Sequence, residues 1–266
     1  MLLPLVSQTL LTRIAGYEVM PASAAIANSL IRLKLAQTNF HDAESVPCIV
    51  HVHNPLTGPN EPDICGIPRD DIGVASASTR VVESDDRLSD RELARTTVVL
   101  GNPPFSGISS NKGAWIDGLL KGVLPGGQQV AGYYHVDGQQ LVERKHWLQD
   151  DYVKFFRYAQ WHIEESGCGV VRFVTNHGYV ENPTFRGMRQ CLMHTFTDLY
   201  VIDLHGSRKK HERTPSGKPD KNIFAIEQGV AVGIFARQPD GEPSETIGHA
   251  DLWGQELIDV LTCRLA

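Results

Sequence analysis

The residues of this chain best suited to chemistry form one tetrapeptide at the end of an apolar run: Asn102, Pro103, Pro104 and Phe105. The run 97–100, Thr-Val-Val-Leu, predicts a buried strand that stops abruptly at this point. Each proline fixes its φ and removes a backbone N–H. The strand end therefore carries an amide oxygen, bare carbonyls and an aromatic ring on a rigid turn. An amino group on a flat heterocycle can donate to these oxygens while its ring stacks on Phe105. The alternative is an ordinary proline-rich turn.

The tetrapeptide resembles motif IV of amino-methyltransferases that use S-adenosylmethionine, written [D/N/S]-P-P-[Y/F]. Further short motifs follow it along the chain. They are Ser106-Gly107, Ser110-Asn111-Lys112-Gly113, Asp151-Tyr152-Val153-Lys154-Phe155, Ala159-Gln160-Trp161, Phe173-Val174-Thr175-Asn176, Asn182-Pro183-Thr184-Phe185-Arg186-Gly187-Met188-Arg189-Gln190, Asp203-Leu204-His205-Gly206 and Gln228-Gly229-Val230-Ala231. The series resembles the methylase portion of single-polypeptide, type I-like (type ISP or IIG) restriction-modification enzymes, which methylate the N6 amine of adenine in DNA. The resemblance covers about residues 16–237.

This resemblance implies an α/β, Rossmann-like methyltransferase fold, with a mostly parallel sheet and helices on both faces. It assigns residues 1–240 to a partial catalytic domain with irregular insertions at about 55–92 and 107–149. Residues 241–266 would begin a C-terminal extension. The implied cofactor is S-adenosylmethionine. The implied partners are DNA and the remaining regions of a larger restriction-modification polypeptide.

Composition agrees with this class. At 266 residues, 41% hydrophobic and 21% charged, the chain can bury one α/β core. Five scattered cysteines without a CxxC pair favour a reducing cytoplasm over a disulfide framework. No apolar stretch is long enough to cross a membrane, and we expect no export signal. The net charge of −6 leaves DNA binding to a local basic surface.

Hydrophobic patterns predict alternating strands and helices. Predicted strands are 13–19, 48–53, 97–100, 170–175, 199–204 and 229–236, the last of which runs antiparallel in the resembled fold. Predicted helices are 21–37, 151–165 and one that begins at Asn182-Pro183. The alternation favours a mostly parallel sheet covered by helices.

Two polar residues at strand ends are candidates for cofactor binding. Glu18 ends the first strand, where a carboxylate can accept hydrogen bonds from both ribose hydroxyls. The resemblance places Asn54 near the cofactor adenine. The alternatives are a solvated glutamate and an ordinary Asn-Pro turn. His51 and His53 share a strand face, but zinc needs three or four ligands, so we predict no metal site.

The family's glycine-rich cofactor loop, an Asp-Pro-x-x-Gly-x-Gly-like turn, should precede Glu18 by some tens of residues. The chain starts too late to contain this loop or the first strand. The expectation is therefore a fragment of a larger methylase, truncated or mis-started at its N-terminus. Glycine is needed in such a loop because the backbone approaches the cofactor closely.

The resemblance also implies a mechanism of direct methyl displacement. Hydrogen bonds from adenine N6 to the Asn102 side-chain oxygen and the Pro103 carbonyl would make the nitrogen more nucleophilic. Phe105 would stack on the flipped base. Phe224 resembles a second aromatic contact, with a core phenylalanine as the alternative. Lys209 and Lys210, in the basic loop Arg208–Lys221, are candidates for phosphate contacts, with a solvated loop as the alternative.

Two other functions stay open from the sequence. One is a catalytically incomplete fragment that acts only as a DNA- or partner-binding module. The other is a methyltransferase for an RNA base or a protein glutamine, because the Asn-Pro-Pro-[Tyr/Phe] turn serves those amines too.

Overall fold

The structure is a computed structural model. It describes residues 14–38, 48–58, 97–105, 107, 109–141, 146–220, 222, 224 and 226–254. The chain divides into two compact units, Met1–Asp85 and Asp86–Ala266, and each unit is described by itself. Most of the predicted insertion at 55–92 lies outside the described residues.

The first unit is a β-α-β element built from β1 (Gly16–Glu18), α2 (Pro21–Gln37) and β2 (Val50–Val52). The two strands pair in parallel, as expected when a helix connects them. Asn28 of α2 fastens the helix to β2, because its side-chain amide donates to the Val50 carbonyl and accepts from the Ile49 and Val50 N–H groups. The helix bounds match the prediction, and both strands are shorter than predicted.

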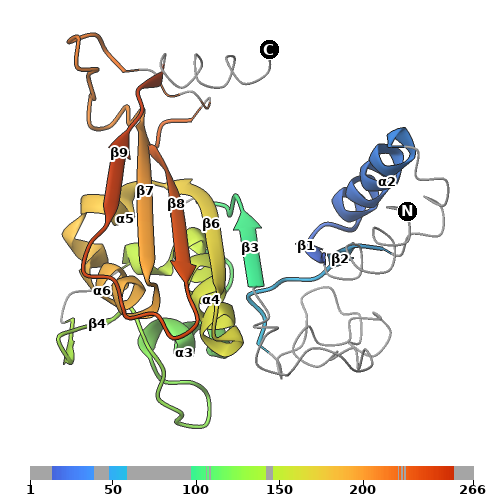
Figure 1. Cartoon of the computed structure of the whole chain (residues 1–266), viewed down its shortest axis with the longest axis horizontal. Coiled ribbons are helices and arrows are strands. Elements are labelled where there is room, and N and C mark those ends of the chain that lie inside the picture. The colour runs from blue at the N-terminus through green and yellow to red at the C-terminus, as the bar shows by residue number, and fades with distance from the viewer. Residues whose placement is uncertain are drawn as a thin grey trace. The chain divides into compact units, whose positions relative to one another are not determined.

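The second unit contains a five-stranded sheet in the order β3-β6-β8-β7-β9 (Figure 1). The strands are β3 (Thr97–Gly101), β6 (Gly169–Asn176), β7 (Asp198–His205), β8 (Val230–Arg237) and β9 (Gly248–Asp251). The β3–β6 and β7–β9 pairs are parallel. The strand β8 is antiparallel to both of its neighbours, as predicted. The strand β9 was not predicted. It lies within the proposed C-terminal extension at 241–266, and it adds a fifth strand to this sheet.

Helices and short turns cover one face of the sheet in the described part of this unit (Figure 1). They are α3 (Ala114–Lys121), η4 (His146–Gln149), α4 (Asp151–Ser166), α5 (Gly178–Glu181), η5 (Pro183–Phe185) and α6 (Arg186–Thr195). A hairpin of β4 (His135–Val136) and β5 (Gln139–Gln140) precedes η4. One apolar core joins α4, α5 and α6 to alternate residues of β6, β7 and β8.

Within the second unit taken by itself, two features differ from expectation. Helices were expected on both faces of the sheet, but the described helices pack on one. Both crossovers, β3 to β6 and β6 to β7, progress in the same direction, and right-handed crossovers of that kind place their helices on the same face. The apolar run 97–100 predicted a buried strand, yet Val98 is 59% and Leu100 is 68% exposed.

The local signals for helix ends are confirmed. Gly167 ends α4 in a left-handed conformation with φ +77°. Asn182 caps the turn that leads into α6, because its side chain accepts from the Thr184 N–H at 2.9 Å. Within the segment predicted to be irregular, α3 was missed.

In the described residues, no helix is long and apolar enough to cross a membrane. The cysteines Cys48, Cys168 and Cys191 are free thiols; the other two, Cys65 and Cys263, lie outside the described residues.

Candidate functional site

The Asn-Pro-Pro-Phe turn begins where pairing between β3 and β6 ends, at Gly101 opposite Phe173. Gly101 fits here because a Cβ would lie 3.0 Å from the Phe173 ring. Asn102 is exposed and Pro103 is buried beneath it. Phe105 is partly buried against the core. The turn thus presents the exposed Asn102 amide next to a buried proline, and the Phe105 ring follows three residues later.

The turn shares an edge of the sheet with the ends of three other strands. Because β3, β6, β7 and β9 run in one direction, their carboxyl ends lie at the same edge. In open α/β sheets this is the edge where ligands bind. Three of the motifs that follow the turn, around residues 176, 203 and 228, also lie at this edge.

Side chains from the start of α4 hold the segment that follows the turn. We call Gly107, Ser109 and Asn111 the post-turn segment. The Asp150 carboxylate accepts from the Gly107 N–H at 3.0 Å. Asp151 Oδ1 accepts from Ser109 Oγ at 2.6 Å and from Asn111 Nδ2 at 2.8 Å.

Lys154 completes this network from the next turn of α4. Its ammonium donates to Ser109 Oγ at 2.8 Å and to the Asn111 carbonyl. The residue is only 1% exposed, and burial lowers the pKa of its ammonium while Asp151 opposes that change. The network therefore links a buried cation, a buried anion and the post-turn segment.

Asp150 is buried, and one of its two oxygens has no partner. Oδ1 forms no hydrogen bond within the described part of the chain. Burial raises the pKa of this carboxyl above 3.8, and the hydrogen bond from Gly107 opposes the change. A buried carboxylate oxygen without a partner is costly, so Oδ1 makes this helix end less stable than a fully hydrogen-bonded one.

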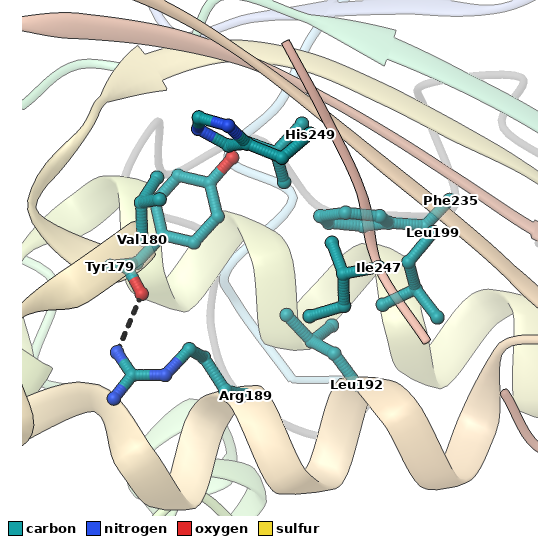
Figure 2. A pocket seen from close by; sticks show the side chains of 9 residues that line it. Tyr179, Val180, Arg189, Leu192, Leu199, Phe235, Ile247 and His249 are labelled. Carbon is teal, nitrogen blue, oxygen red and sulfur yellow. Dashed lines mark hydrogen bonds between the residues drawn. The ribbon is translucent and has the colours of Figure 1, made fainter. Parts of the chain in front are cut away.

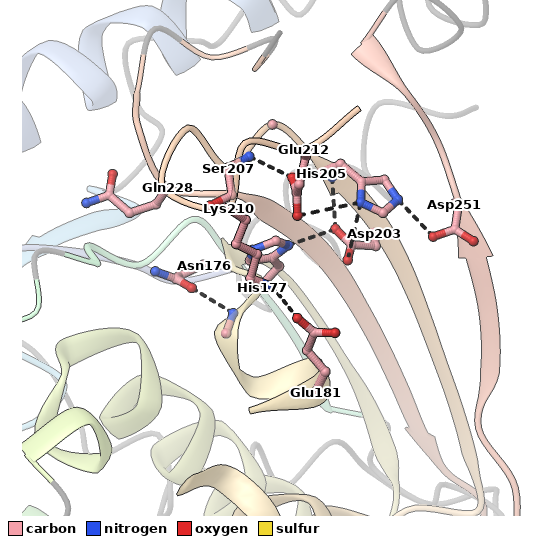
Figure 3. Close-up of polar contacts among 12 residues, drawn as sticks. Asn176, His177, Glu181, Asp203, His205, Ser207, Lys210, Glu212, Gln228 and Asp251 are labelled. Atoms are coloured by element: carbon pink, nitrogen blue, oxygen red, sulfur yellow. Dashed lines mark hydrogen bonds and ion pairs between the residues drawn. The ribbon is translucent and has the colours of Figure 1, made fainter. Parts of the chain in front are cut away.

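A cluster of histidines and carboxylates occupies the carboxyl edge at β6 and β7 (Figure 3). Asp203 Oδ1 accepts from the His205 N–H at 2.8 Å and lies 3.1 Å from His177 Nδ1. Although burial alone raises the pKa of Asp203, its hydrogen bonds to His177 and His205 outweigh burial and hold that pKa below 3.8. The carboxylate therefore fixes the orientation of the His177 ring.

The residue directly before β8 is Gly229, and its contact with His177 explains why it is a glycine. Its carbonyl accepts from the His177 N–H at 3.0 Å. A Cβ at this position would overlap the His177 ring. Three segments that the sequence shows only as separate motifs thus meet at one place. They are Asn176-His177, Asp203-Leu204-His205 and Gln228-Gly229.

His205 extends the cluster to β9. Its Nε2 lies 2.8 Å from Asp251 Oδ1, and its ring stacks on Trp253 with centroids 3.6 Å apart. The residue adopts φ +53°, a conformation that L residues rarely take outside turns and functional sites. Among the described residues, no group of three His, Cys, Asp or Glu is arranged to hold a metal ion.

The basic loop follows β7 at the same edge, and its described basic residues are exposed. Lys209 is exposed. Lys210 forms an ion pair with Glu181 (Figure 3), which lowers the pKa of that carboxyl. Lys221 lies outside the described residues. The Phe224 side chain is 41% exposed, which excludes the alternative that it is a core phenylalanine.

The two candidate cofactor residues belong to the first unit and differ in availability. Glu18 is partly exposed, and its Oε1 accepts from the Met20 N–H at 2.9 Å. Asn54 is 5% exposed, and its Oδ1 accepts from the Leu56 N–H at 3.1 Å. The structure therefore favours the ordinary-turn alternative for Asn54, because its amide oxygen stabilises its own turn.

A pocket of about 220 Å³ lies on the helix-covered face (Figure 2). Its walls come from α5, α6, β7, β8 and the β9 region. Arg189 donates to the Tyr179 carbonyl at 2.8 Å, and burial raises the pKa of the Tyr179 hydroxyl. None of the wall residues belongs to the turn or to the post-turn segment.

Reasoning from the sequence missed Asp150, the ring-holding role of Asp203 and the role of Lys154. The sequence carries no local signal for the burial of Lys154. It is two residues from both Tyr152 and Phe156, so it lies on the opposite side of α4 from these two core residues.

Neither a protein-family model nor a curated protein matches this chain. Among solved structures, the ATP-dependent Type ISP restriction-modification enzyme LlaBIII bound to DNA matches 93% of this chain at 21% identity, with a TM-score of 0.59. A DrdV–DNA complex matches 62% of the chain at 24% identity (TM-score 0.46). A nuclease-deletion mutant of the Type ISP enzyme LlaGI with a DNA substrate mimic matches 63% at 20% identity (TM-score 0.49).

This chain spans 16% of the length of each of those three structures. The likeness to LlaBIII shows that the chain shares the fold of the matched part of that enzyme. That fold is mixed α/β, with a mostly parallel central sheet that is compatible with a Rossmann-like fold.

Proposed function

We propose that this chain is part of a restriction-modification enzyme and transfers a methyl group from S-adenosylmethionine to adenine N6 in DNA. The observation that carries the proposal is the exposed Asn102 on a buried Pro103 at the carboxyl end of β3. An amide buried in the apolar interior could not receive a substrate amine. The shared fold with LlaBIII, a restriction-modification enzyme bound to DNA, supports the same assignment.

In this proposal the turn binds the extruded base. The Asn102 side-chain oxygen and the Pro103 carbonyl accept hydrogen bonds from the N6 amine, which favours a pyramidal and more nucleophilic nitrogen. Phe105 stacks on the base, an interaction worth roughly 1–3 kcal/mol. Alignment and charge placement supply the rest of the catalysis, so no covalent nucleophile is needed.

Glu18 fits the part assigned to it toward the cofactor. Its Oε1 is used by the Met20 N–H, and Oε2 forms no hydrogen bond within the described part of the chain. A carboxylate at the end of a parallel strand can use its spare acceptor positions for ribose hydroxyls. S-adenosylmethionine, when bound, supplies the methyl group as an electrophile on sulfur.

DNA phosphates have a basic surface available at the same edge. Arg208, Lys209 and Arg213 are exposed on the loop after β7, although the whole chain carries a net charge of −6. Contacts of this kind position DNA and make binding depend on salt. Phe224 is exposed on the segment before β8, where it can reach a ligand.

The test is methyl transfer to unmethylated plasmid DNA, with N6-methyladenine measured by mass spectrometry. We expect Asn102→Ala to lower kcat by about 100-fold or more, because it removes an acceptor aimed at the reacting amine. Asn102→Asp, which keeps an acceptor oxygen, is the matched control and should retain more activity.

Two other outcomes would replace the proposal. If calorimetry with S-adenosylmethionine at high concentration gives no heat, the chain is a binding module and not an enzyme. If methyl transfer occurs only to RNA or protein acceptors, the substrate is a different amine.

A further inference from the structure

Three charged residues at the start of α4 are almost completely buried. Asp150 is 3%, Asp151 8% and Lys154 1% exposed. A buried charge loses its hydration, which is unfavourable unless hydrogen bonds or an opposite charge compensate for the loss. Their partners in the structure are mainly groups of the post-turn segment, Gly107, Ser109 and Asn111.

The Ser109 hydroxyl is the centre of this network. It donates to Asp151 Oδ1 at 2.6 Å, and it accepts from Lys154 Nζ at 2.8 Å and from the Asn111 N–H at 3.0 Å. Asp151 also binds the Asn111 side chain, and Lys154 also binds the Asn111 carbonyl. Two residues of the post-turn segment are thus bound by both charges of α4.

The helix that supplies these charges is itself fixed in the core. Tyr152, Val153 and Phe156, on the same turns of α4, belong to the apolar cluster that includes β6. The post-turn segment has no helix or strand of its own before α3. Its position is therefore set by α4, and Gly107 lies only two residues after Phe105.

We infer that Lys154 and Asp151 are positioning residues: through Ser109 and Asn111 they hold the post-turn segment and so place Phe105 and Asn102 for the extruded base. This inference rests on the proposed function, because it explains how the same site acquires its geometry. It also explains why the Ser110-Asn111 and Asp151–Phe155 motifs, 40 residues apart, occur together.

The first readout needs no activity. Lys112 is exposed directly after the post-turn segment, so trypsin cleavage after Lys112 in the native protein measures how firmly the segment is held. We expect Lys154→Met to speed this cleavage at least tenfold, because the apolar side chain fills the same space without the two hydrogen bonds. Lys121→Met is the matched control: it removes an exposed lysine, paired with Asp117 at 2.6 Å, that does not contact the segment.

The second readout is the division between kcat and KM in DNA methylation. We expect Lys154→Met to lower kcat about tenfold or more and to leave KM for S-adenosylmethionine within about twofold, since the residue acts through the position of the turn. Ser109→Ala, a milder change that keeps both buried charges, should shift both readouts in the same direction, and it decides the question if Lys154→Met does not fold.

The outcomes separate the two proposals. Faster cleavage with a lower kcat, and no effect of Lys121→Met, supports the inference. Unchanged cleavage and kcat in a folded Lys154→Met or Ser109→Ala protein overturns it. A wild-type protein that binds S-adenosylmethionine but methylates no DNA overturns the proposed function instead, and the cleavage rates then still show whether α4 holds the segment.

Discussion

The polar residues of the candidate site differ sharply in their exposure to water. Asn102 is exposed, as an acceptor for an incoming amine must be. Asp150, Asp151 and Lys154 are buried, where a charge is stable only with partners. One oxygen of Asp150 has no partner among the described residues, so burial of this residue destabilises the fold. Asp151 and Lys154 have hydrogen bonds that compensate for their burial.

Replacement of Asp150 by asparagine should stabilise the protein at neutral pH. Burial raises the pKa of Asp150 above 3.8, so the folded protein keeps this proton to a higher pH than the unfolded chain does. The stability of the wild type therefore falls as pH rises from 3.8 through the raised pKa. Asparagine never ionises, and its side-chain oxygen can still accept from the Gly107 N–H. Urea unfolding at several pH values measures the difference.

We expect the Asp150→Asn protein to gain stability over the wild type as pH rises through this window, and the gain to level off above it. Asp198→Asn is a suitable comparison because the pKa of Asp198 is lowered by hydrogen bonds from Thr197 and Gln238, so its effect should have the opposite sign. A stability difference that does not change with pH would contradict the proposed destabilisation by Asp150.

The sequence predicts Asn102 but not the residues that hold the segment after it. The reason is that those residues lie far from their partners along the chain. The prolines that expose Asn102 are its immediate neighbours. Lys154 binds groups 43 and 45 residues away, and nothing near Lys154 in the sequence indicates those partners. For Asn54, the family pattern suggests a residue near the cofactor, and the structure adds that its amide oxygen also accepts a hydrogen bond within its own turn.

At the scale of the elements, the five-stranded sheet has two unlike faces. On β7, Leu199 and Val201 are buried under the helices, whereas Tyr200 between them is 53% exposed. On β3, Val98 and Leu100 are exposed on the face opposite the helices. Alternation along a strand assigns its neighbouring side chains to opposite faces, so these exposures agree with a sheet that helices cover on one side.

Two leucine substitutions should separate the faces. We expect Leu199→Ala to lower the free energy of unfolding by about 2–5 kcal/mol, because it leaves a cavity in the core. Leu100→Ala should lower it by less than about 0.5 kcal/mol, because that side chain is already exposed to water. Urea unfolding followed by circular dichroism measures both. Similar losses for the two variants would mean that the outer face is covered.

Strong amphipathic patterns predicted the helices well, and short elements were missed for identifiable reasons. The pattern of Tyr152, Phe156 and Ala159 with Gly167 after it gave α4 almost to the residue. The helix α3 spans only Ala114–Lys121 and contains Gly118, a poor helix former. The structure requires glycine there, because a Cβ would lie 2.7 Å from the Val123 carbonyl oxygen. That constraint is tertiary and cannot be seen in the local pattern.

At the scale of the whole molecule, the residues proposed for function are distributed over the two compact units. Glu18 belongs to the unit Met1–Asp85, whereas the turn and the post-turn segment belong to Asp86–Ala266. Among the residues that the structure describes, the buried core cluster runs from Leu120 to Phe235, all within the second unit. The second unit therefore has the apolar burial needed to fold independently.

A chain limited to residues 86–266 should fold and unfold cooperatively. All four tryptophans of the protein, Trp115, Trp147, Trp161 and Trp253, lie in this unit, so tryptophan fluorescence reports its unfolding in both the short and the full chain. We expect urea midpoints that agree within about 0.5 M, because the core that unfolds is the same and the slope scales with the surface exposed.

Binding provides the complementary measurement on the same two chains. Because Glu18 is absent from the short chain, S-adenosylmethionine should bind it at least tenfold more weakly than it binds the full chain, and Glu18→Ala in the full chain should weaken binding in the same direction. Equal affinity of the short and full chains would remove Glu18 from the cofactor site. A short chain that unfolds without cooperativity would show instead that the core of the second unit depends on the first.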